Sequence, residues 1–243
     1  MTKQTDAIMD QVLQLENNEL QALLTGERFN TGTTRTNNDE MEKDGCIVIK
    51  NLCDPEELYY PVPLERGQIV YRDASRFEHI EQDPQVPGSL SRHNHPQYRS
   101  IYNKVRKKLE DLLERRLSRT FYYDRYYFSG QELKKHLNSE QHEITVTIHI
   151  SNNLKEEWPV WIKTSDTYTD KVKSAILVPG DERSIVLEPG DALVYKGCER
   201  PCWRDKMHSK QSKIWWFGDE KEYYYHELCL NYVLSDGNRS YFG

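Results

Sequence analysis

The pattern that most constrains this chain is an alternation with a period of two that begins near residue 121 and continues to residue 234. Apolar or aromatic residues alternate with polar ones in short segments bounded by turn residues: 121–128, 143–151, 158–164, 173–179, 183–188, 191–197, 213–218 and 223–234. Such alternation is typical of half-buried β-strands. Eight short strands that follow two or three helices predict an α+β protein whose β part is a barrel or a double-sheet jelly roll.

Helical periodicity is confined to the first half of the chain. Residues 5–25 place apolar side chains at mostly helical spacing, and Gly26 is a plausible end for this helix. The polar, Asn- and Thr-rich stretch that follows predicts a linker, so we expect residues 1–40 to form a helical arm with its linker and residues 41–243 to form the main domain. The arm either packs on that domain, which we favour, or docks on a second subunit and forms an oligomer.

Between the arm and the strands, four further features are predicted. Residues 46–49 form a short apolar strand, and Pro55 suits the first position of a helix. Residues 60–97 are rich in proline with little periodicity, which predicts a long irregular surface segment and a substrate lid in an enzyme. Residues 98–117 are the clearest helix, with one apolar stripe opposite a face of mixed charge.

Composition excludes several classes of protein. The formal net charge is −6, which argues against a globally basic nucleic-acid binder, so the mixed face of the 98–117 helix is predicted to be solvated. No stretch approaches the roughly 20 apolar residues that cross a bilayer, and the N-terminus lacks the pattern of a secretory signal. With an odd number of cysteines, five, we expect reduced thiols in a soluble cytoplasmic protein.

One ordered set of residues suggests a specific chemistry. Tyr127, Gly130, Leu133 and His136 follow one another at intervals of three, Asn138 comes two residues later, and a threonine-containing strand follows. A Leu-Glu-Pro-Gly-Asp turn occupies residues 187–191. This order resembles the prolyl-hydroxylase-like branch of the iron(II)/2-oxoglutarate dioxygenases. The stretch 197–204 is similar to phage-encoded members of that branch, in which a histidine stands at the position of Cys202.

The resemblance covers roughly residues 41–243 and implies a double-stranded β-helix, the jelly roll of these oxygenases. It places the three metal ligands at His136, Asn138 and Cys202. A two-histidine, one-carboxylate triad binds Fe(II) on one face and leaves the other face open. Here an amide replaces the carboxylate and a readily oxidised thiol replaces the second histidine. The resemblance therefore implies Fe(II) and 2-oxoglutarate as cofactors, with activity altered or lost.

The resemblance also implies a site for the distal carboxylate of 2-oxoglutarate. Tyr127 stands where the family places a tyrosine near that carboxylate, and Thr147 points to the same side of its strand as Thr145. The basic anchor comes about ten residues after the second histidine, which makes Lys213 the candidate, with Arg204 and Lys210 as alternatives.

Three hypotheses of function stay open. The first is a working hydroxylase of a protein or peptide side chain such as proline, with His142, His149 or His208 replacing a lost ligand. The second is a pseudoenzyme, in which the jelly roll serves as a binding or scaffold module. The third is a β-sandwich that binds a carbohydrate or peptide; it ranks last because it leaves the ordered motif unexplained.

Overall fold

Two antiparallel β-sheets face each other in the part of the chain that the structure, a computed structural model, describes: residues 37–58, 80–164, 180–207 and 223–243. These residues belong to one unit, Asn37–Gly243. The predicted 5–25 helix and the predicted strands 173–179 and 213–218 lie outside the described residues. The predicted boundary near residue 40 stays a prediction.

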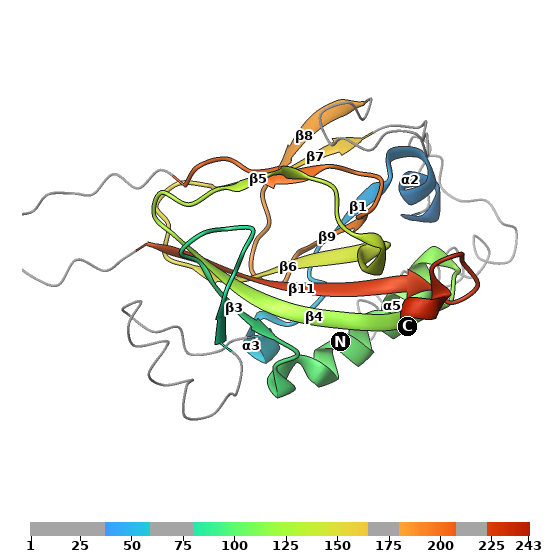
Figure 1. The fold of residues 1–243 in the computed structure, drawn as a ribbon. Coiled ribbons are helices and arrows are strands. Elements are labelled where there is room, and N and C mark those ends of the chain that lie inside the picture. Colours follow the sequence, from blue (N-terminus) through green and yellow to red (C-terminus); the bar gives the residue numbers. More distant parts are fainter. Residues whose placement is uncertain (1–36, 59–79, 165–179, 208–222) are drawn as a thin grey trace, which may run out of the picture. The chain divides into compact units, whose positions relative to one another are not determined.

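The larger sheet has seven strands in the order β1-β9-β6-β11-β4-β3-β2, and the smaller has four in the order β5-β10-β7-β8. Their bounds are β1 Cys46–Ile49, β2 Ile80–Gln82, β3 Leu90–His93, β4 Leu117–Phe128, β5 Leu133–His136, β6 Ile144–Asn152, β7 Val160–Thr164, β8 Asp181–Ile185, β9 Ala192–Lys196, β10 Cys202–Arg204 and β11 Tyr224–Leu234. From β4 to β11 the chain crosses repeatedly between the sheets (Figure 1). This strand order is that of a double-stranded β-helix, so the predicted α+β jelly roll is confirmed.

Helix α5 (Arg99–Leu113) packs against the outer face of the larger sheet, on the side away from the smaller one (Figure 1). Alternation along β6 explains this packing. Ile144, Val146, Ile148 and Ile150 join the hydrophobic core that contains α5, whereas the intervening residues turn toward the smaller sheet. The helix ends at Leu113 because Glu114 adopts a left-handed conformation with φ of 52°.

The other helical segments are short. Helix α2 (Asn37–Asp44) precedes β1, and α3 (Pro55–Leu58) starts at the proline that the sequence suggested. Single 3₁₀ turns occupy η1 Pro96–Tyr98, η2 Glu140–His142 and η3 Ser240–Phe242. No helix among the described residues is long and apolar enough to cross a membrane.

The prediction of an irregular segment over residues 60–97 is wrong for its described part, because β2 and β3 form a hairpin there and β3 pairs with β4. Buried charge explains why apolar alternation did not indicate this strand. Arg92 of β3 donates to Asp124 of β4, which also contacts His226 Nε2 at 2.8 Å. Burial opposes ionisation of Asp124, but the charge of Arg92 outweighs it and holds the pKa of that carboxyl at about 2.

Candidate functional site

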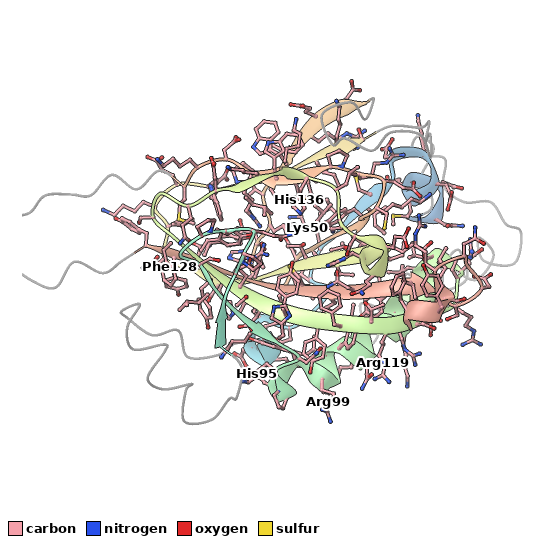
Figure 2. All side chains as sticks on the ribbon, viewed as in Figure 1. Lys50, His95, Arg99, Arg119, Phe128 and His136 are labelled. Carbon is pink, nitrogen blue, oxygen red and sulfur yellow. The ribbon has the colours of Figure 1, made fainter. Side chains whose placement is uncertain are left out.

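The three positions that the resemblance assigns to the metal come together at one end of the smaller sheet. His136 ends β5, and its partner across the sheet is Cys202, the first residue of β10. Asn138 follows two residues after His136, and its backbone N–H donates to the carbonyl of Gly197 at 2.9 Å. Figure 2 shows His136 in the space between the two sheets.

Close packing holds this end of the barrel together. The Asn138 side-chain nitrogen donates to the Tyr195 hydroxyl at 3.1 Å and to Thr145 Oγ1 at 3.2 Å. A Cβ at Gly197 would lie 2.3 Å from the His142 carbonyl and 2.8 Å from the Asn138 side-chain nitrogen. Only glycine therefore allows the chain after β9 to pass so near to Asn138.

Of these three side chains, only His136 is an ordinary donor for a divalent metal. Its Nδ1 lies 2.8 Å from the Lys134 carbonyl, a contact that requires the proton on Nδ1 and puts the lone pair on Nε2. Burial lowers the pKa of this imidazole, which favours the neutral form that binds metals.

The other two side chains do not suit Fe(II). Burial raises the pKa of the Cys202 thiol to about 12, so the sulfur carries its proton at neutral pH. The Asn138 nitrogen is committed to two hydroxyls, and an amide adds no charge to balance that of a metal. Within the described ranges, no group of three His, Cys, Asp or Glu side chains is placed to hold a metal ion. The donors present therefore do not fit the iron centre that the resemblance implies.

The histidines considered as substitutes have other partners. His149 uses Nδ1 on the Leu187 carbonyl at 2.6 Å and Nε2 on the Asn152 side chain at 3.0 Å, and it stacks on Tyr225. His142 contacts Ser139 through Nδ1 and meets Phe121 edge to face. Burial lowers the pKa of His142 to about 4, and the charge of His136 adds to this effect. His208 lies outside the described residues.

The predicted cosubstrate residues Tyr127 and Arg204 already hold a carboxylate, that of Glu227 on β11. The Tyr127 hydroxyl donates to Glu227 Oε1 at 2.8 Å, and Arg204 Nη2 donates to Glu227 Oε2 at 3.0 Å. Arg125 donates to the Tyr127 hydroxyl at 2.9 Å and lies 3.8 Å from Glu227 Oε1. All of these side chains are buried. The barrel therefore contains a carboxylate site that a residue of the chain itself occupies.

The remaining cosubstrate candidates are placed differently. Thr147 turns into the barrel, where its hydroxyl lies 3.8 Å from the Cys229 sulfur, a long contact without a carboxylate. Lys213 and Lys210 lie outside the described residues. Of the residues predicted for this role, the structure brings Tyr127 and Arg204 together around one carboxylate.

The sequence pattern did not identify Glu227 or Arg125 as site residues. Glu227 of β11 and Arg125 of β4 lie directly opposite each other in the sheet. A signal for both was present. Each is a charged residue in the middle of a strand otherwise made largely of aromatic and aliphatic residues, on the face that alternation turns inward. A charge at such a position is costly unless it is paired, so two of opposite sign predict a buried ion pair.

No family model matches this sequence, and no curated protein matches it. Solved structures do match by fold. An oxidoreductase of the 2OG-Fe(II) oxygenase family from Burkholderia pseudomallei is 12% identical, with a TM-score of 0.52 over 85% of this chain and 92% of that one. HygX from Streptomyces hygroscopicus, solved with nickel and 2-oxoglutarate, is 10% identical, with a TM-score of 0.53 over 82% and 87%. A prolyl-4-hydroxylase from Pseudomonas putida is 10% identical, with a TM-score of 0.50 over 79% and 95%.

These likenesses define the class of fold: the chain shares the double-stranded β-helix of 2-oxoglutarate/Fe(II) oxygenase structures. At such low identity the agreement concerns the fold alone.

The buried imidazole of His149 predicts a loss of stability in acid. Burial lowers the pKa of His149 to about 4, so the folded protein keeps this ring neutral while the unfolded chain binds a proton near pH 6.5. The neutral ring therefore makes its full contribution to stability above pH 6.5. As the pH falls toward 4 that contribution is lost, and the free energy of unfolding falls by about 2 to 3 kcal/mol. Urea unfolding at pH 7.0 and pH 4.5 measures it. His149→Gln should reduce the difference in unfolding free energy between pH 7.0 and pH 4.5. Replacement of the exposed His93 by glutamine should leave that difference unchanged. An unaltered difference in His149→Gln contradicts the prediction.

Proposed function

We propose that this protein is an oxygenase-fold pseudoenzyme, a jelly-roll binding module that does not activate oxygen. The proposal rests on the side chains at the three positions that the resemblance assigns to the metal. Of these, His136 alone is in a form that ordinarily binds a divalent metal. Cys202 and Asn138 contribute a protonated thiol and a neutral amide. Even changes outside the ligands of a metal site typically weaken binding about 10- to 100-fold, so two altered ligands should abolish useful affinity.

The proposed partner is a protein or peptide rather than a nucleic acid. The likeness of fold to a prolyl-4-hydroxylase and the prolyl-hydroxylase-like order from Tyr127 to Arg204 support this class of ligand. The net charge of −6 argues against the phosphate backbone as a partner. The phage-like stretch 197–204 and a cytoplasmic location belong to the same proposal. For residues 1–40, we keep an arm that packs on the main domain, with oligomer formation as the alternative.

Calorimetry on anaerobically purified protein tests the loss of the metal site. Titration with Fe(II) or Mn(II), with and without 2-oxoglutarate, should give no saturable heat in either condition. The matched control is His136→Ala, which should behave as the wild type does. Micromolar binding that tightens with 2-oxoglutarate and disappears in His136→Ala contradicts the proposal.

The alternative is an active hydroxylase with rearranged ligands, and the electrostatic interaction of His136 with His142 favours it. In that case both His136→Ala and His142→Ala should remove the calorimetric binding, and the wild type should consume 2-oxoglutarate in the presence of a peptide substrate.

A further inference from the structure

The interior carboxylate of Glu227 is surrounded as a bound ligand would be. Its oxygens have different partners, the Tyr127 hydroxyl of β4 at 2.8 Å and Arg204 Nη2 of β10 at 3.0 Å. Arg125 lies 3.8 Å from the oxygen that Tyr127 contacts. The side chains of Glu227, Arg125 and Arg204 are at most 3% exposed, so water competes little for these contacts.

The groups that hold Glu227 are themselves fixed by other residues. Arg204 donates through Nη1 to the Trp158 carbonyl at 2.9 Å, and its guanidinium lies 4.3 Å from the centre of the Tyr225 ring. Arg125 is held by Asp83, whose Oδ2 lies 2.7 Å from Arg125 Nε, and by Gln85 Oε1 at 2.9 Å. The donors would therefore remain in place if the Glu227 carboxylate were removed, and a preorganised site loses little free energy on binding a ligand.

We propose that the barrel contains a carboxylate receptor that the chain fills with its own Glu227. The residues that the resemblance gives to the cosubstrate, Tyr127 and Arg204, bind this internal carboxylate, so free 2-oxoglutarate finds their donors already used. The inference rests on the proposed function in one respect, since it treats the barrel interior as a cosubstrate site that has lost its cosubstrate. The class of ligand that the emptied site accepts is a small monocarboxylate.

The geometry suggests a probe of matching shape. Replacing Glu227 with alanine removes one methylene and the carboxylate, which are the atoms of acetate. A cavity of about 190 Å³ lies beside Trp158 and Tyr225, the residues that contact Arg204. Acetamide has nearly the same shape without the charge and serves as the matched control.

The experiment compares thermal unfolding of Glu227→Ala in acetate, acetamide and sodium chloride at equal concentration. Acetate should raise the midpoint by about 5 °C or more once it is well above its dissociation constant, whereas acetamide and chloride should not. If Glu227→Ala is unfolded without ligand, the same comparison follows the recovery of the β-sheet circular dichroism signal. The wild type should show no specific response to acetate or 2-oxoglutarate.

A second variant shows whether the response comes from this site. Glu227→Ala combined with Arg204→Met lacks the principal donor, and its midpoint should not respond to acetate. Equal responses of Glu227→Ala to acetate, acetamide and chloride overturn the proposal, as does the absence of any response to acetate. A wild type that 2-oxoglutarate stabilises overturns it as well.

The metal titration separates this proposal from the proposed function. Saturable binding of Fe(II) to the wild type, together with specific rescue of Glu227→Ala by acetate, would refute the loss of the metal site and leave the internal carboxylate standing. Absence of metal binding together with absence of rescue would support the loss of the metal site and refute the internal carboxylate receptor.

Discussion

Replacement of Glu227 by glutamine is expected to lower the free energy of unfolding by about 3–5 kcal/mol, since it removes one partner of a buried ion pair. Arg204 is 1% exposed in its side chain, and Glu227 is the carboxylate it contacts among the described residues. Glutamine keeps the shape but loses the charge, and its amide nitrogen cannot accept the hydrogen bond that Arg204 or Tyr127 donates. The guanidinium is then buried without its counter-charge.

Urea unfolding followed by circular dichroism measures this loss. Glu57→Gln is the matched control, because Glu57 pairs with Lys104 at 2.9 Å in an ion pair whose side chains are 48% and 57% exposed. Exposed pairs contribute roughly 0–1 kcal/mol, so this control should change little. Arg204→Met combined with Glu227→Gln should recover part of the loss, because the uncompensated charge is gone. A loss below about 1 kcal/mol in Glu227→Gln would contradict a tightly held internal carboxylate.

The combined substitution Asn138→Asp and Cys202→His is expected to create a site for Fe(II) or Mn(II) that the wild type lacks. His136 and Cys202 face each other as partners of β5 and β10, and Asn138 is two residues from His136, so the new side chains should converge with the existing imidazole. The hydroxyls of Tyr195 and Thr145, which accept from Asn138, can donate to an aspartate instead. Affinity should rise roughly 100-fold or more over Asn138→Asp alone.

Anaerobic calorimetry with Mn(II) provides the measurement, and unfolding curves establish that the double variant is folded. Adding His136→Ala to the double variant should abolish the gain, which shows that the metal occupies these positions. A folded double variant that binds no more metal than the wild type would contradict the assignment of the three positions. We also expect 2-oxoglutarate to leave the affinity unchanged while Glu227 is present.

Alternation along β4, β6, β9 and β11 is strong, so the sequence alone predicted an α+β protein with a barrel or a jelly roll, and the resemblance of its motifs selected the jelly roll. The sequence was insufficient for β5 and β10, which have 4 and 3 residues and show too little alternation to stand out. Their pairing depends on each other and on β7, contacts far apart in the sequence. The hairpin of β2 and β3 was missed because an ion pair, rather than an apolar face, joins Arg92 to Asp124.

For the candidate site, the sequence by itself determined which residue types stand at each position: a histidine at 136, an amide at 138 and a thiol at 202. Local order carried that information, because motif spacing is a property of neighbouring residues. Only the tertiary structure decided the protonation of Cys202, through its burial, and the occupant of the interior carboxylate site. Tyr127, Arg204 and Glu227 come from β4, β10 and β11, and only their convergence inside the barrel fixes which carboxylate they share. Burial then makes that pairing obligatory, because a charge shielded from water requires a partner of opposite sign.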